Sequence, residues 1–159
     1  MSVKRYIDTT NGILRALTEL YENEDVDLLF KGHPRGHEAP YDLAGFKKYE
    51  NNVTAEMMFM REAQSIRAVY SPVSTAVRTA SLFGIHAYIF DELYDFSEET
   101  RHQNKRSLLE FSDVVNLRSL DELQLPPGNS DPPHFSNEDD LKRLADVFED
   151  IMGERDAGR

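Results

Sequence analysis

The sequence contains no cysteine and no tryptophan. The absence of cysteine excludes disulfide bonds, thiolate metal ligands and a cysteine nucleophile. Basic residues are few: 18 lysines and arginines stand against 29 aspartates and glutamates, which gives a formal net charge of −11. That balance argues against broad nucleic-acid binding, which needs a basic surface. It still permits a mononucleotide, because one helix N-terminus and one or two local cations can hold a single phosphate.

Long apolar runs are also missing. Residues 1–11 are polar and lack the apolar core of a signal peptide. The longest apolar stretches, at 55–60 and 85–90, are far too short to span a bilayer. We therefore expect a cytoplasmic protein without a transmembrane segment. Its 159 residues have room for one domain and not for two full ones.

Short apolar segments and helix-like segments alternate along the chain. Buried strands are predicted where apolar residues run together, at 26–30, 66–70, 85–90 and 114–117. Helical spacing and capping residues predict helices that begin at Thr9 or Thr10 and at Ser136, and others at 43–49, 55–64, 75–83 and 97–112. Strands that alternate with helices predict a Rossmann-like three-layer α/β/α domain with a parallel sheet.

The composition divides the chain into three parts. Residues 1–125 are expected to form the α/β domain. Four of the seven prolines lie between 125 and 135, which marks residues 126–135 as a proline-rich linker. Residues 136–159 are expected to form an amphipathic helix and a tail, because a Ser-x-x-Asp capping pattern precedes apolar residues at helical spacing.

The turn after the first predicted strand carries a histidine between two cations. Gly32 lets the backbone turn and Pro34 fixes its φ angle, so that His33 would lie at the tip of the strand. A histidine flanked by Lys31 and Arg35 can hydrogen-bond or protonate a phosphate leaving group. From residue types alone, a structural loop histidine explains the same pattern.

A second turn, at residues 70–76, leads from a predicted strand into a helix that begins with hydroxyl side chains. The free N–H groups and the dipole of that helix suit one phosphate, and Ser74 and Thr75 would add hydroxyl donors. Plain N-capping by Ser74 explains the residue equally well.

Glu56 lies at the start of the helix predicted at 55–64. A carboxylate there stabilises the helix dipole, or it accepts hydrogen bonds from two ribose hydroxyls, as acidic residues do in nucleotide-binding folds. We expect no metal site, because no carboxylate or second histidine stands at metal-ligand spacing from His37, His86, His102 or His134.

Taken in chain order, four segments resemble the C-terminal, donor-nucleotide-binding domain of bacterial GT-B sialyltransferases of the Pasteurella and Photobacterium type. These segments are Phe30-Lys31-Gly32-His33-Pro34, Asn52-Val53-Thr54-Ala55-Glu56, Ser74-Thr75 and Tyr88-Ile89-Phe90. The His-Pro pair and the Ser-Ser/Thr pair are markers shared with the related lipooligosaccharide sialyltransferases and polysialyltransferases. The resemblance covers residues 27–123, which is most of the chain.

The resemblance implies CMP-sialic acid as the donor substrate, with no cofactor and no metal required. His33 would hydrogen-bond the donor phosphate and act as the acid for the departing CMP, and Ser74 and Thr75 would bind the same phosphate. These roles agree with the chemistry, because sialyl transfer has an oxocarbenium-like transition state in which charge develops on the leaving phosphate. The resemblance further implies that Glu56 holds the ribose and that the nucleotide site is lined by Lys31, Gly32 and Pro34.

The chain differs from the family because it lacks the motif that carries the general base. The family carries that base in an Asp/Glu-Asp/Glu-Gly motif of an N-terminal domain, whereas only 32 residues precede His33 here. We expect the acceptor-binding domain to be absent and the isolated chain to be inactive in transfer. The chain would then be a fragment, a partner of a separate acceptor-binding domain, or a domain that kept binding and lost transfer. Exposed apolar helix faces would favour self-association.

Three other functions fit the residues. The chain could be the nucleotide-binding half of another GT-B glycosyltransferase that uses a UDP or GDP sugar. It could be a non-catalytic interaction module that binds a partner through its acidic surface, with no nucleotide affinity. It could also be a small regulatory domain that binds phosphate without preference for a base.

Overall fold

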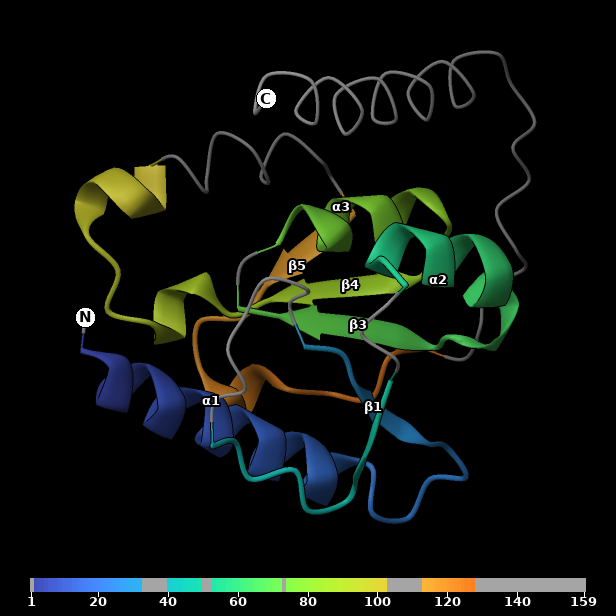
Figure 1. The fold of residues 1–159 in the computed structure, drawn as a ribbon, viewed down its shortest axis with the longest axis horizontal. Coiled ribbons are helices and arrows are strands. Elements are labelled where there is room, and N and C mark those ends of the chain that lie inside the picture. Colours follow the sequence, from blue (N-terminus) through green and yellow to red (C-terminus); the bar gives the residue numbers. More distant parts are fainter. Residues whose placement is uncertain (1, 33–39, 50–52, 73, 103–112, 128–159) are drawn as a thin grey trace.

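The computed structural model describes residues 2–32, 40–49, 53–72, 74–102 and 113–127. Helices and short strands alternate along this part of the chain (Figure 1). The elements are α1 (Val3–Leu20), β1 (Leu28–Phe30), β2 (Phe46–Lys48), α2 (Ala55–Glu62), η1 (Ala63–Ser65), β3 (Ala68–Ser71), α3 (Thr75–Leu82), β4 (His86–Ile89), η2 (Asp91–Leu93), β5 (Val114–Asn116) and η3 (Leu120–Glu122). Residues 98–102 are also helical.

The strands form two parallel sheets. β1 pairs with β2, and the other sheet has the order β3-β4-β5. In the larger sheet Tyr70 lies beside Tyr88, which lies beside Val115. The α/β class with parallel strands, predicted from the alternation of elements, is confirmed.

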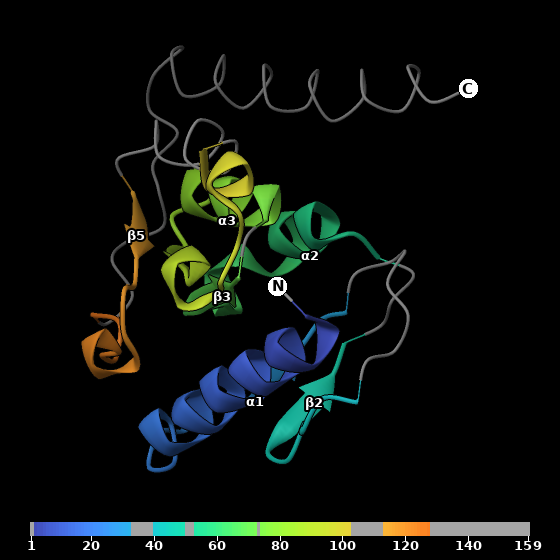
Figure 2. The ribbon, with the colours of Figure 1, turned by 90° about the vertical axis from the view of Figure 1, so that its left-hand side faces the viewer.

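Helices cover both faces of the larger sheet. Figure 2 shows α1 on one side of β3, and α2 with α3 on the other. Successive strand residues point to opposite faces, and the burial follows this period of two. Ala87 and Ile89 of β4 therefore pack with Val77 and Phe59 from the two helices, whereas Tyr88 faces the α1 side.

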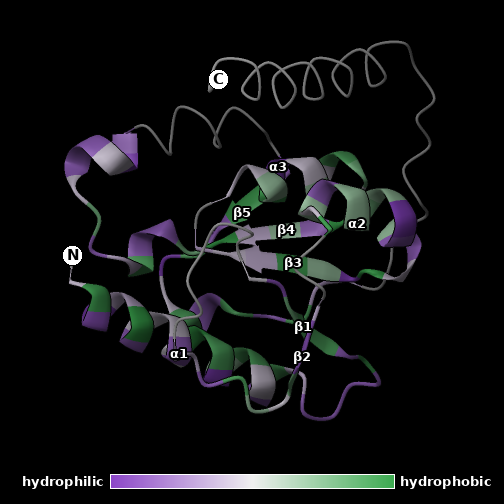
Figure 3. Ribbon diagram, viewed as in Figure 1, coloured by the Kyte–Doolittle hydropathy of each residue, from purple (hydrophilic) through white to green (hydrophobic). Residues whose placement is uncertain are grey.

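The core on the α1 side is rich in aromatic residues. The stacked rings of Tyr70 and Tyr88 lie 4.8 Å apart, and the Tyr21 hydroxyl at the end of α1 lies 2.9 Å from the Tyr70 hydroxyl. Tyr94 is fully buried in the same cluster and contacts Thr10 of α1 through a hydroxyl–hydroxyl hydrogen bond of 3.0 Å. Apolar and polar residues alternate along α1 in Figure 3, as expected of a helix with one buried side.

The predicted start of the first helix is wrong. α1 begins at Val3, with Ser2 as its N-cap, and Thr9 and Thr10 lie inside it. The Thr10 hydroxyl donates to the Tyr6 carbonyl one turn earlier and lies against Tyr94, so it serves packing and does not cap. A threonine inside a helix can satisfy its hydroxyl in this way, which the local sequence does not distinguish from a cap.

The helix predicted at 43–49 is also wrong, because Phe46–Lys48 forms strand β2 beside β1. Gly45 precedes it with a φ of 86°, a conformation that favours glycine and takes the chain out of any helix. An exposed ion pair of 2.6 Å between Lys47 and Asp27 accompanies the strand pairing. Pairing with a distant strand has overridden the local preference.

The other boundaries follow the sequence closely. Thr54 caps α2 and Ser74 caps α3, as predicted, and Gly84 follows α3 with a φ of 70°. Residues 103–112 of the predicted helix 97–112, most of the linker and the helix expected after Ser136 lie outside the described residues. Pro126, at the start of the predicted linker, is fully buried. None of the helices in the described part of the chain is long and apolar enough to cross a membrane.

Candidate functional site

The carboxyl ends of β3, β4 and β5 lie at one edge of the larger sheet, because the three strands are parallel. Ligands of open parallel sheets bind at this edge, where the chain leaves each strand. β3 ends at Ser71 and leads through Pro72 to Ser74 at the start of α3. The ends of β3 and β4 are tied together by the Phe90 N–H, which donates to the Ser71 carbonyl over 3.1 Å.

Ser74 lies at the position that the sequence predicted. Its backbone is extended and its side-chain oxygen accepts a hydrogen bond of 3.1 Å from the Ala76 N–H. The hydroxyl therefore caps α3 and can still donate its own hydrogen. Thr75 is the first residue of the helix and is exposed. This helix start combines N–H groups, a positive dipole end and two hydroxyls, which suits one phosphate.

Lys31 and Gly32 directly follow β1 and are both half-buried. The Lys31 ammonium nitrogen is buried and makes no hydrogen bond to the part of the chain that the structure describes. His33 and Pro34 lie outside the described residues. The roles proposed for these two residues therefore remain predictions.

Glu56 is half-buried in the first turn of α2, just after the Thr54 cap. Within the described ranges, the predicted site residues make no hydrogen bond or ion pair with one another: Lys31, Gly32, Glu56, Ser74 and Thr75. The structure thus places each of them at a strand end or a helix start, without linking them directly.

Two further polar residues at the sheet edge escaped the sequence reasoning. Asp91, which follows β4, is only 2% exposed, and its Oδ1 has no hydrogen-bond partner among the described residues. Asn116, the last residue of β5, has a buried Oδ1 that likewise lacks a partner there. An acidic residue directly after the clearest predicted strand was the available signal for Asp91.

Burial raises the pKa of two core tyrosines, Tyr70 and Tyr94. Desolvation is the main cause that raises the pKa of Tyr70, and the hydrogen bond with Tyr21 raises it further. Desolvation also raises the pKa of Tyr94 above its usual range, with Thr10 acting in the opposite direction. Both phenols are therefore neutral at physiological pH and serve as packing groups with hydroxyl partners.

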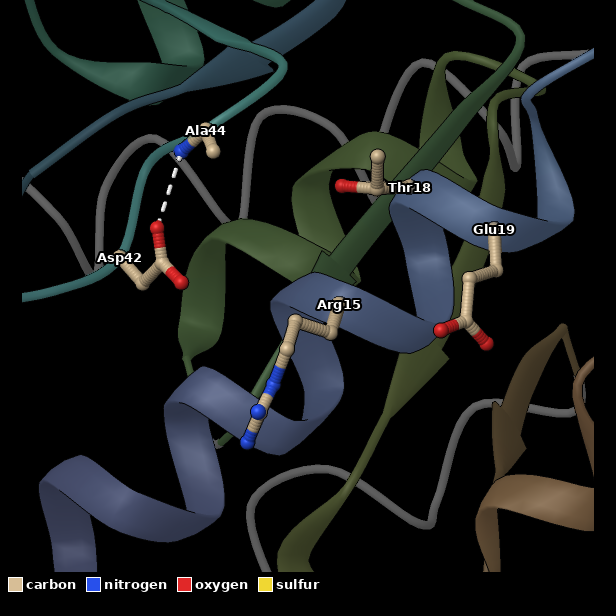
Figure 4. Close-up of a pocket in the computed structure, with 5 residues that line it drawn as sticks. All are labelled: Arg15, Thr18, Glu19, Asp42 and Ala44. Carbon is tan, nitrogen blue, oxygen red and sulfur yellow. Dashed lines mark hydrogen bonds between the residues drawn. The ribbon is translucent and has the colours of Figure 1, made fainter.

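A pocket lies elsewhere, between α1 and the segment that leads to β2 (Figure 4). It is lined by Arg15, Thr18, Glu19, Asp42 and Ala44, and it contains none of the predicted site residues. The Asp42 carboxylate accepts a hydrogen bond of 3.3 Å from the Ala44 N–H within the segment on one side of the pocket. Arg15 and Glu19 are exposed there, so their charges are well hydrated.

Among the described residues, no group of three or more histidine, aspartate or glutamate side chains could hold a metal ion. The expectation that the chemistry needs no metal stays a prediction.

Comparisons with known proteins identify no relative. No family model matches the chain, and neither the curated proteins nor the solved structures give a significant match.

Proposed function

We propose that the chain binds CMP-sialic acid at the carboxyl edge of the larger sheet, as the donor-binding half of a sialyltransferase-like glycosyltransferase. The observation that carries the proposal is the start of α3. Ser74 and Thr75 begin the helix that follows β3 after a short turn, at the place where α/β proteins hold phosphate. The order of the His-Pro, Glu56 and Ser-Thr segments supports CMP-sialic acid as the donor.

The phosphate would lie at the N-terminus of α3. The positive end of the helix dipole attracts an anion, while the Ala76 and Val77 N–H groups already donate to Ser74. The attraction is local, and salt screens the net charge of −11 over longer distances. Ser74 would donate its hydroxyl hydrogen to the phosphate while its oxygen keeps the cap on Ala76.

The nucleoside would lie toward β1 and α2. Lys31 and Gly32 leave β1 at its carboxyl end, and Glu56 in the first turn of α2 would accept hydrogen bonds from ribose hydroxyls. His33, with Pro34 beside it, would protonate the leaving phosphate. An imidazole side chain suits that role, because the unperturbed pKa of histidine lies close to neutrality and a general acid works best when its pKa is near the working pH.

Transfer requires a general base and an acceptor site, and we assign neither to the described residues. The partner that completes the reaction would be a separate acceptor-binding domain, or a second copy of the chain through self-association. A cytoplasmic location is part of the same proposal, because nucleotide sugars are its substrates.

Calorimetric titration with CMP, UMP and GMP tests the proposal. We expect selective CMP binding by the wild-type chain, weakened at least about tenfold in Ser74→Ala and in His33→Ala, because each removes a hydrogen bond to a charged phosphate. Ser97→Ala is the matched control. Ser97 also caps a helix, through a 3.2 Å bond from the Thr100 N–H, but lies outside the proposed site.

Both cap variants should lose similar stability, about 1 kcal/mol, so that a difference in affinity reports the ligand and not the cap. Absence of binding to any of the three nucleotides by a folded chain would contradict the proposal and favour a non-catalytic interaction module. Equal binding of the three would favour a phosphate-binding domain without base preference.

A further inference from the structure

Asp91 is an unusual residue for its position. It is 2% exposed, and its Oδ1 has no hydrogen-bond partner among the described residues. Removing a carboxylate from water without a hydrogen bond or a counter-charge is costly, so buried carboxylates in proteins are normally paired. A buried carboxylate oxygen without a partner at the ligand-binding edge of a parallel sheet is a candidate for ligand contact.

Asn116 presents a second buried acceptor on the neighbouring strand. Its Nδ2 donates to Glu92 Oε1 over 3.4 Å. Because a carboxylate only accepts hydrogen bonds, this contact fixes the amide orientation and leaves Oδ1 as the free atom. That Oδ1 is buried and has no partner within the described ranges.

The two acceptors lie at the same edge of the sheet. Asn116 pairs with Ile89 in the register of β4 and β5, and the Leu117 N–H donates to the Ile89 carbonyl over 2.9 Å. Asp91 is two residues beyond Ile89 and adjoins Glu92, which Asn116 contacts. On the other side of β4, the Phe90 N–H holds the end of β3, from which the chain enters α3.

The chemistry of the two Oδ1 atoms indicates which kind of ligand group could bind them. Two acceptor oxygens call for hydrogen-bond donors, which hydroxyl groups supply. A phosphate or another anion would be repelled by the Asp91 carboxylate. Two protein oxygens are also fewer than the six to eight ligands that Ca²⁺ takes, and Mg²⁺ likewise requires an octahedral set.

We propose that Asp91 and Asn116 form a subsite that accepts hydrogen bonds from hydroxyl groups of the sugar in the nucleotide-sugar donor. This inference rests on the proposed function, because the phosphate at the start of α3 sets the position of the sugar. The nucleoside lies toward β1 and α2, and the sugar extends from the phosphate toward β4 and β5.

The test compares CMP with CMP-N-acetylneuraminic acid in calorimetric titrations of the wild-type chain and Asp91→Asn. We expect the substitution to weaken donor binding at least about tenfold, because it removes a charged acceptor, and to leave CMP binding unchanged. The midpoint of thermal unfolding of the free variant should equal or exceed that of the wild type, because the charge of a buried carboxylate with an unpartnered Oδ1 has been removed. Asp95→Asn is the matched control, since Asp95 is exposed and pairs with Arg5.

The outcomes separate the subsite from the proposed function. If the wild type binds neither CMP nor the donor, the proposed function fails and the subsite with it. If both bind and Asp91→Asn binds the donor as the wild type does, only the subsite is wrong.

Equal weakening of CMP binding and donor binding in Asp91→Asn would show that Asp91 contacts the nucleotide. A lower unfolding midpoint in this variant would show that the Asp91 carboxylate has a partner within the protein. Loss of donor binding on addition of a chelator would indicate a bound cation. Each of these three results also overturns the sugar subsite.

Discussion

At the residue scale, the half-buried pair of Arg67 and Glu24 links three segments of the chain. The Arg67 guanidinium contacts the Glu24 carboxylate at 2.6 Å and also donates to the Pro126 carbonyl over 3.1 Å. Its hydrogen bond to Glu24 raises the pKa of Arg67, so the guanidinium keeps its positive charge up to strongly alkaline pH. The guanidinium thereby ties the start of β3 to the turn after α1 and to the residues at the end of the described chain.

Replacing Arg67 by methionine should therefore lower the free energy of unfolding measurably, because it leaves a half-buried carboxylate and a carbonyl without their donor. Urea denaturation measures the change. Lys47→Met is the control, because the Lys47–Asp27 pair is exposed and should contribute less than about 1 kcal/mol. Equal losses in the two variants would contradict the importance assigned to Arg67.

The buried tyrosines predict how stability depends on pH. Burial raises the pKa of Tyr70 and of Tyr94 in the folded state. Their contribution is then fully present below the unfolded-state pKa of about 10 and is lost as the pH rises above it, because the unfolded chain releases these protons first. Urea denaturation at a series of alkaline pH values should show this decline, with a shallower slope in Tyr94→Phe. An identical slope in that variant would argue against the shifted acidity.

At the scale of elements, replacement of two glycines by alanine is expected to change the stability in opposite directions. Gly45 has a φ of 86°, and a Cβ there would lie 3.2 Å from the Thr18 Cγ2 atom of α1. Gly12 lies within α1, and a Cβ there would meet nothing within 4 Å. The first position needs glycine and the second does not.

We expect Gly45→Ala to destabilise the protein by about 1–2 kcal/mol, through backbone strain and contact with Thr18. Gly12→Ala should stabilise it by about 0.5–1 kcal/mol, because alanine is the better helix former. Thermal unfolding followed by circular dichroism measures both. Destabilisation by both substitutions would show that Gly12 serves a contact not seen in α1.

The sequence predicted those elements whose signals are local. The caps at Thr54 and Ser74 and the strand around Ile89 follow from capping residues and a continuous apolar run, and all three are present. β2 could not be predicted, because it depends on pairing with β1. Asp91 and Asn116 were missed for a related reason: burial without a partner is a property of the folded packing and not of residue type.

At the scale of the whole molecule, different helices cover the two faces of the larger sheet. α2 and α3 pack on one face around Phe59 and Val77, and α1 covers an aromatic cluster on the other. This packing holds the strand ends at the edge where Ser74, Asp91 and Asn116 lie. Side chains on regular elements with packed neighbours keep their geometry better than side chains on long loops.

The central claim, phosphate binding at the start of α3, is tested most directly by nuclear magnetic resonance of the uniformly ¹⁵N-labelled chain titrated with CMP. We predict saturable shifts of the Thr75, Ala76 and Val77 amide signals, which belong to the first turn of α3. Shifts confined to the pocket around Arg15 and Asp42, or no shifts in a folded chain, would contradict the claim.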